Sequence, residues 1–179
     1  LFWAMTSQGL FAQTNTTSTA TDELKEWDHF ATFCLDAGVV TGDESDFFGL
    51  NWGASAGYQF CLWNNFSLGP EVGYSGFTGK ETDFGFETEG VGFIPIKAKG
   101  RLNFIEDFFA AVGFGYALGA TEGNAGGVTY DVGVGLDISD VLLRLSNDAL
   151  RVEVSTQYNA IQVNGGSFGS FTGGVGLRF

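Results

Sequence analysis

The stretch Val128-Thr-Tyr-Asp-Val-Gly-Val-Gly-Leu-Asp-Ile138 decides the fold of this chain, because large apolar residues occupy every second position over its whole length. One face carries the apolar side chains Val128, Tyr130, Val132, Val134, Leu136 and Ile138. The other face carries Thr129, Asp131, Gly133, Gly135 and Asp137. A period of two residues belongs to a β-strand with two unlike faces, and no helix has it. The stretch therefore predicts a long strand with one apolar and one polar face.

The same alternation recurs along the chain from residue 31 onward. It predicts further strands at residues 31–40, 50–62, 66–77, 91–104, 108–118, 150–160 and 171–179. Short connections at 63–66 and 105–107 alternate with longer ones at 41–48, 77–90, 120–127 and 161–169, and only the long connection 139–149 breaks this order. Short turns on one rim and long loops on the other, with an even number of strands, are typical of outer-membrane barrels. The prediction is an all-β fold, an up-and-down antiparallel eight-stranded transmembrane β-barrel over residues 31–179.

The polar face of these strands is rich in Gly, Ala and Ser, with scattered charges. A water-exposed exterior would be dense in Lys and Glu, whereas the lumen of an eight-stranded barrel must be filled by side chains of matched size. We therefore place the polar face inside. Its charges are expected to pair with one another, because buried charges persist only when paired, and an ion pathway is the alternative. The predicted lumen charge network comprises Lys97, Lys99, Arg101, Glu71, Asp131, Asp137, Arg151, Glu153 and Arg178, with Asp36 as a further candidate.

Aromatic residues of the apolar face gather near both ends of the predicted strands. Toward the long loops lie Tyr74, Tyr116, Tyr130, Tyr158 and Phe171, and toward the short turns lie Phe60, Phe66, Phe104, Phe108 and Phe179. Two such girdles mark the interfaces of a membrane. The strand at 171–179 spans roughly 20 Å along the membrane normal at ~3.3 Å per residue, which approaches the ~25 Å apolar band of outer-membrane barrels.

The first residues are typical of the end of a secretory signal. We expect residues 1–12 to be a signal-peptide remnant and residues 13–30 a polar N-terminal leader without a function of its own. A mature N-terminal strand is the alternative interpretation of the apolar start.

Composition excludes several classes of function. The net charge of -13, with only 8 Lys and Arg, argues against nucleic acid, because such binders need clustered basic residues. No apolar run reaches the roughly 18 to 20 residues of a transmembrane helix. The single histidine, His29, precedes the first predicted strand, and neither a metal-ligand spacing nor a cofactor motif is found. We therefore expect no enzyme and no cofactor.

The two cysteines, Cys34 and Cys61, share the polar face of consecutive predicted strands. A disulfide across the first hairpin would suit an oxidising periplasm, but the geometry of a disulfide is demanding. A Cys34–Cys61 disulfide and two separate lumenal thiols are equal alternatives at this point.

Two segments resemble the small outer-membrane β-barrel domain family of Gram-negative envelopes. They are Phe171-Thr-Gly-Gly-Val-Gly-Leu-Arg-Phe179 and Gly92-Phe-Ile-Pro-Ile-Lys-Ala-Lys-Gly-Arg101, and the resemblance extends over residues 31–179. It implies a location in the cell outer membrane. It also implies an assembly signal, read by the barrel-assembly machinery, made of Phe171, Val175, Leu177 and Phe179. It transfers no catalytic residue, because the family shares a fold and a location more than an activity.

Acidic residues collect in the first two long connections, at Asp43, Glu44, Asp46, Glu81, Asp83, Glu87 and Glu89. They predict either a solvated rim or a contact site for an extracellular partner. The other expected partners are outer-membrane lipid and the assembly machinery, and we expect a monomer. The expected function is a structural or surface-interaction role of a barrel with a packed polar lumen. A small porin-like ion-conducting pore is the alternative, and a soluble lipocalin-like binder of hydrophobic ligands is the third.

Overall fold

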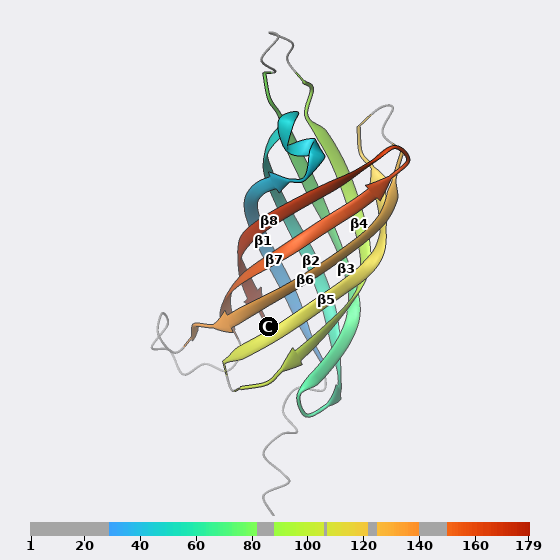
Figure 1. The fold of residues 1–179 in the computed structure, drawn as a ribbon. Coiled ribbons are helices and arrows are strands. Elements are labelled where there is room, and N and C mark those ends of the chain that lie inside the picture. The colour runs from blue at the N-terminus through green and yellow to red at the C-terminus, as the bar shows by residue number, and fades with distance from the viewer. Residues whose placement is uncertain (1–28, 82–87, 106, 122–124, 140–149) are drawn as a thin grey trace, which may run out of the picture.

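A computed structural model describes residues 29–81, 88–105, 107–121, 125–139 and 150–179, which form one closed antiparallel barrel (Figure 1). Its strands are β1 (His29–Thr41), β2 (Phe48–Trp63), β3 (Phe66–Gly79), β4 (Val91–Asn103), β5 (Phe108–Gly119), β6 (Gly127–Asp137), β7 (Arg151–Val163) and β8 (Gly166–Arg178). Each strand pairs with its neighbours in sequence, and β8 pairs with β1. The predicted up-and-down eight-stranded barrel is therefore confirmed.

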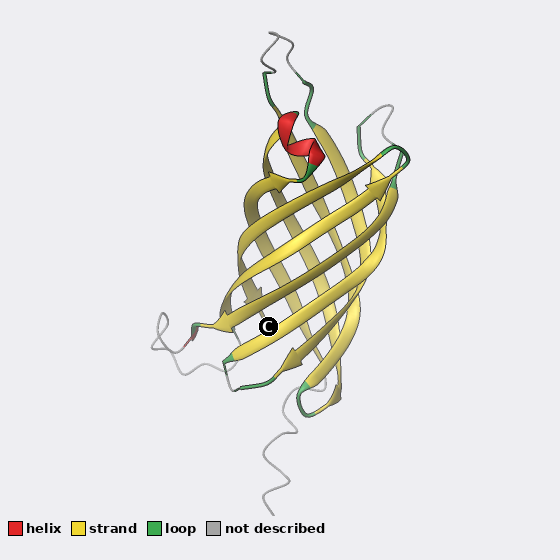
Figure 2. Ribbon diagram, viewed as in Figure 1, coloured by secondary structure: helices red, strands yellow, loops and turns green. Residues whose placement is uncertain are grey.

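The two ends of the barrel differ, and we name them by their connections. The turn end carries the C-terminus and the β2–β3 and β4–β5 turns, and the loop end carries the β1–β2 and β3–β4 connections. Figure 2 shows the short 3-10 helix η1 (Asp43–Asp46) at the loop end, between β1 and β2. Within the described ranges, no helix is long and apolar enough to cross a membrane.

The connection between β7 and β8 differs from the prediction. The sequence predicted a longer loop at 161–169, but β7 continues to Val163 and β8 begins at Gly166. Only Asn164 and Gly165 remain in the turn, and Gly165 has a φ of 103°. Glycine adopts this left-handed backbone without steric cost, and Asn-Gly is a typical two-residue hairpin turn. The alternating apolar pattern ends before the hydrogen-bonded ladder does.

The N-terminal boundary also shifts slightly. Because β1 begins at His29, the last two residues of the predicted leader belong to the barrel. The predicted signal remnant at 1–12 and leader residues 13–28 lie outside the described residues, as does most of the connection at 139–149.

The exterior of the barrel is apolar. Outward side chains in the middle of the strands are strongly exposed, including Val132 at 52%, Phe114 at 66% and Val175 at 54%. A soluble barrel of the lipocalin type turns this face inward around its ligand. The third alternative, a soluble binder of hydrophobic ligands, is therefore wrong.

The strand pairing is irregular at Phe48 and at Pro95, and the first of these irregularities changes which side chain enters the lumen. A register shift between Phe48 and Asn51 in the β2–β3 pairing turns Phe48 inward, against the alternation of the rest of β2, so that it is only 6% exposed. The second irregularity lies at Pro95, which has no amide hydrogen to donate. The β3–β4 pairing lapses there, between Val72↔Ile96 and Ser75↔Phe93, and resumes in the same register.

Candidate functional site

The inward faces of the strands build the candidate site, which is the lumen itself. The nine charged residues predicted for the lumen each make an ion pair with another member of the set. They form two separate clusters, where the sequence predicted one network. The central cluster comprises Glu71, Lys97, Lys99 and Asp131, and the turn-end cluster comprises Arg101, Asp137, Arg151, Glu153 and Arg178.

The central cluster places two ammonium groups between two carboxylates. Lys97 Nζ lies 2.6 Å from Asp131 Oδ2 and 3.0 Å from Glu71 Oε1. Lys99 Nζ lies 3.0 Å from Glu71 Oε2 and 3.7 Å from Asp131 Oδ1. The side chains of Lys97, Glu71 and Asp131 are at most 8% exposed. Each buried charge is thus balanced by an opposite charge from another strand, which is the condition under which buried charges are tolerated.

A glycine makes this cluster geometrically possible. Gly113 of β5 pairs with Lys99 on one side and with Asp131 on the other. A Cβ atom at Gly113 would overlap the Asp131 carboxylate. Because position 113 has no side chain, groups from β4 and β6 meet across β5. The Gly/Ala-rich polar face of β5 therefore has a specific steric role.

The turn-end cluster is centred on Arg101. Its guanidinium donates to both carboxylate oxygens of Glu153, at 2.7 and 2.8 Å. Its Cζ also lies 3.7 Å from the centroid of the Phe109 ring, within the range of a cation–π interaction. Two parallel N–H···O bonds of this kind add stability and also fix the orientation of the guanidinium relative to the carboxylate. Arg101 is consequently held on two sides, by a carboxylate and by an aromatic face.

The remaining members of this cluster share the two carboxylates. Arg178 lies 3.4 Å from Glu153 and 3.2 Å from Asp137, and Arg151 lies 3.3 Å from Asp137. Arg151 is 37% exposed, so its pair is the most solvated of the lumen. Asp36, the further candidate from the sequence, makes none of the ion pairs found in the described part of the chain.

An aromatic plug fills the lumen at the loop end, and it was not predicted from the sequence. It consists of Phe48, Phe77, Phe93 and Phe168. The ring of Phe168 lies 5.2 to 5.3 Å from each of the other three ring centroids. Phe77, Phe93 and Phe168 have the same parity as the lumenal charges of their strands, so the sequence contained a signal for these three, although Phe168 lay in the predicted loop at 161–169. Phe48 could not be found this way, because the register shift brings it inside.

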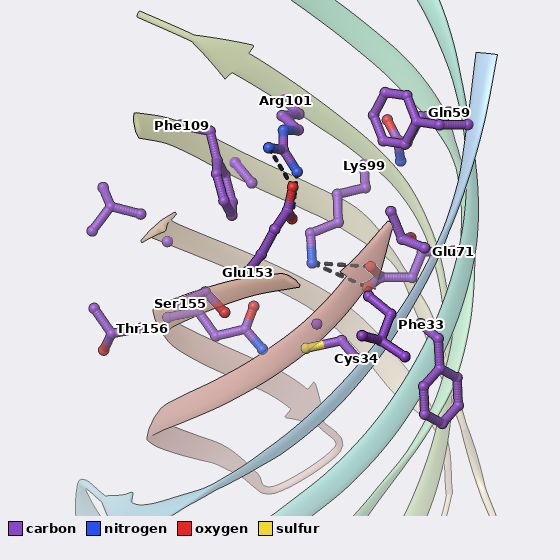
Figure 3. A pocket seen from close by; sticks show the side chains of 18 residues that line it. Phe33, Cys34, Gln59, Glu71, Lys99, Arg101, Phe109, Glu153, Ser155 and Thr156 are labelled. Atoms are coloured by element: carbon purple, nitrogen blue, oxygen red, sulfur yellow. Dashed lines mark hydrogen bonds and ion pairs between the residues drawn. The ribbon is translucent and has the colours of Figure 1, made fainter. Parts of the chain in front are cut away.

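Two cavities lie between these groups. The cavity near the turn end has a volume of about 70 Å³, and Figure 3 shows the side chains of Arg101, Glu153, Lys99, Glu71 and Cys34 around it. A second cavity of about 40 Å³ lies next to the aromatic plug. Glu71 lines both cavities, so the central cluster separates them.

A Cys34–Cys61 disulfide, one of the two alternatives that the sequence left open, does not form. The β1–β2 register places Cys34 opposite Ser55, while Cys61 pairs with Ser67 in β3. Six residues along β2 separate Ser55 from Cys61, which corresponds to about 20 Å at ~3.3 Å per residue. A disulfide needs Cα atoms within about 7 Å. Parity correctly placed both cysteines on one face, but it carries no information on their height in the barrel.

The remaining residues singled out in the sequence, His29 and the described acidic residues of the long connections, lie at the rims of the barrel. His29 is exposed and its ring stacks on Tyr58 at 5.6 Å. Over the described ranges, no group of three or more His, Cys, Asp or Glu side chains could hold a metal ion. At the loop end, Lys80 Nζ donates to the Ser45 carbonyl at 2.9 Å and fixes η1. Of the predicted acidic residues, Asp83, Glu87 and the side chain of Asp43 lie outside the described residues.

The last strand presents the residues of the predicted assembly signal to the outside. Phe171, Val175, Leu177 and Phe179 are 36 to 56% exposed. The backbone of Phe179 exchanges two hydrogen bonds with Ala31, at 2.7 and 3.1 Å. The outward presentation agrees with contact to lipid, and the role in assembly stays a prediction.

Comparison with known proteins places the fold. The sequence matches no protein-family model, and no curated protein is significantly similar to it. The outer-membrane protein Ail of Yersinia pestis, solved in a phospholipid bilayer nanodisc, has a similar structure, with a TM-score of 0.56 and 13% identity over 85% of this chain and 99% of Ail. Neisserial surface protein A gives a TM-score of 0.53 and 15% identity over 84% of this chain and 96% of its own. The chain therefore has the fold of small outer-membrane β-barrels, and its apolar exterior agrees with the predicted location in the cell outer membrane.

Proposed function

We propose that this protein is a closed outer-membrane barrel whose filled lumen makes it a rigid, non-conducting support for its outer loops. One observation carries the proposal: side chains of opposite charge bridge the lumen in two buried clusters, and an aromatic plug lies above them. Buried ion pairs of this geometry cross-link strands that are not neighbours in the sheet. Arg101 and Glu153, for example, connect β4 to β7.

The same geometry argues against a small pore. Ions cross a channel when charged rings or carbonyls face a continuous water path and bind the ion weakly. Here the lumenal ammonium and guanidinium groups are already neutralised by carboxylates at 2.6 to 3.4 Å. An entering ion would have to displace a partner that is fixed on a strand.

A surface-interaction role is supported by the first connection. η1 is held by Lys80, which donates its side chain to the Ser45 carbonyl and its amide to the Phe47 carbonyl at 2.8 Å. Asp46 and Phe47 remain exposed beside it. A fixed acidic and aromatic loop favours a basic partner surface, and it requires no catalytic group.

The proposal is tested by planar-bilayer recording on the refolded protein, with folding checked by heat-modifiable migration. We expect no steady conductance above the lipid baseline. Steady single-channel currents that fall when Lys99 is changed to Gln would overturn the proposal and support the pore, because Lys99 is the more exposed lysine of the central cluster at 17%.

A further inference from the structure

We infer that two seals of different chemistry close the lumen, one at each end, and that the space between them holds water. The inference rests on the proposed closed barrel, and it adds where the barrel is closed and what occupies the remaining space.

The loop-end seal is apolar. Besides the four rings of the aromatic plug, Val40 and Ile161 belong to the same buried cluster, and Phe93 is fully buried. The rings are tilted or edge-on to one another, with centroids 5.2 to 6.5 Å apart. This is the packing that aromatic side chains prefer in protein cores. A constriction lined only by such groups excludes water and hydrated ions.

The turn-end seal is polar and aromatic. The Arg101 guanidinium lies against the Phe109 ring on one side and binds Glu153 through two hydrogen bonds. Arg178 adds a second guanidinium, with its Cζ 5.3 Å from the centroid of the Phe30 ring. Phe30, Phe109, Arg101 and Glu153 are all buried. A Cβ at Gly135 would overlap the Phe109 ring, so the absence of a side chain there admits the ring into the lumen.

The space between the seals contains a buried polar atom that lacks a hydrogen-bond partner among the described residues. Gln59 is 4% exposed and lines the turn-end cavity, and its Oε1 accepts no hydrogen bond from the described residues. Asp131 Oδ1 also lacks a hydrogen-bond donor there, with only a 3.7 Å contact to Lys99 Nζ, but Asp131 lines neither cavity. Buried acceptors are almost always satisfied by protein or by ordered water.

The cavity volumes fit this assignment. One water molecule needs about 10 to 15 Å³ of such space and two or more polar partners. The turn-end cavity offers about 70 Å³ beside Gln59, Lys99 and Glu153, and the loop-end cavity offers about 40 Å³. Both have polar groups in their lining, whereas cavities lined only by apolar groups stay dry. Water in the turn-end cavity therefore completes the hydrogen bond that Gln59 Oε1 leaves open.

Thiol labelling in lipid nanodiscs tests the two seals, because both faces of the barrel are then open to one reagent. Cys34 lines the turn-end cavity and reports on it in a Cys61→Ser background. Ser75→Cys reports on the loop-end cavity in a background lacking both native cysteines. The probe is a charged methanethiosulfonate. With both seals intact, we expect neither thiol to react before the barrel is unfolded.

Trimming each seal should expose only its own reporter. Phe168→Ala should raise the labelling rate of the cysteine at position 75 by at least tenfold and leave Cys34 protected, whereas Phe109→Ala should do the reverse. The matched controls Phe171→Ala and Phe114→Ala remove outward rings from the same strands and should expose neither thiol. Should Phe168→Ala prevent folding, Phe48→Ala replaces it, because Phe48 lies at the start of β2 and outside its regular register.

The outcomes separate this inference from the proposed function. Fast labelling of either cysteine in the untrimmed barrel, or failure of the folded seal variants to expose their reporters, would overturn the two-seal arrangement even if no current is recorded. Currents through the untrimmed barrel would contradict the proposed function and the two seals together, whereas labelling without current contradicts the seals alone.

A second substitution tests the water. Gln59→Leu removes the acceptor without changing the seals. If water satisfies Gln59, the substitution leaves the urea midpoint of unfolding unchanged or lowers it. A raised midpoint would mean that Gln59 is unsatisfied in a dry cavity, and the hydrated space would be excluded.

Discussion

Replacing Glu153 by Gln should destabilise the barrel by about 3 to 5 kcal/mol, the usual cost of removing one partner from a buried ion pair. Glu153 accepts two hydrogen bonds from Arg101, at 2.7 and 2.8 Å, and lies 3.4 Å from Arg178. The side chains of Arg101 and Glu153 are 8% exposed and that of Arg178 is 16% exposed. The substitution keeps the shape of the side chain but removes the carboxylate with which Arg101 pairs, while Arg178 keeps its pair with Asp137.

The assay is urea unfolding of the protein in phospholipid vesicles, followed by tryptophan fluorescence and by heat-modifiable migration. Arg151→Gln is the matched control, since it breaks an ion pair of the same cluster in which the arginine side chain is 37% exposed. Solvated ion pairs contribute at most about 1 kcal/mol to stability. A cost below about 1 kcal/mol for Glu153→Gln, or one no larger than that of the control, would refute the claim that this cluster is buried. The double replacement Arg101→Met with Glu153→Leu should recover most of the loss, because apolar pairs of similar volume often replace buried ion pairs without cost.

Three further predictions address packing, membrane contact and assembly. Gly113→Ala should destabilise the barrel by about 1 to 3 kcal/mol through overpacking. Gly100→Ala is the control and should be nearly neutral, because a Cβ there meets its nearest neighbour at 3.5 Å. Equal midpoints of urea unfolding for the two variants would contradict this prediction. Val132→Arg, in the middle of the apolar exterior, should destabilise the barrel by about 2 to 4 kcal/mol, and Leu118→Arg, near the loop end, by about 1 kcal/mol or less. The losses are measured by unfolding from vesicles. Equal losses would contradict a membrane centred on Val132. Phe179→Ala should reduce the amount of barrel recovered in outer membranes of expressing cells more than it changes refolding into detergent, and a parallel loss in both would argue against an assembly signal.

Most of the fold could be predicted from the alternation of apolar and polar side chains. A period of two residues fixes which side chains share a face, and in a closed barrel one face must be the lumen. For this reason the inward positions of Lys97, Glu71 and Arg178 could be predicted from parity alone. The apolar exterior could also be predicted, since a face of Gly, Ala and Ser would cover a water-exposed surface poorly.

Height along the barrel axis could not be predicted in the same way. The separation of Cys34 from Cys61 and the division of the charges into two clusters depend on the stagger between strands, which alternation does not encode. Phe48 was not predicted to lie in the lumen, because one extra residue in β2 turns its side chain from the exterior to the interior. The Asn164-Gly165 turn, in contrast, had a recognisable sequence signal, but the apolar pattern on either side of it was too weak to extend both strands.

The seam between β1 and β8 has a consequence for the order of folding. All other strand pairs join neighbours in sequence, whereas this pair joins the first strand to the last, from Thr32↔Arg178 to Thr41↔Gly169. Closing the largest loop costs the most chain entropy and yields nothing until its contacts form. Until then, both edges would present unpaired amides and carbonyls, which hydrocarbon cannot satisfy. Protection of the β1 and β8 amides that point into this seam should therefore appear last in pulsed hydrogen exchange during refolding, at the same moment as full burial of the barrel in lipid.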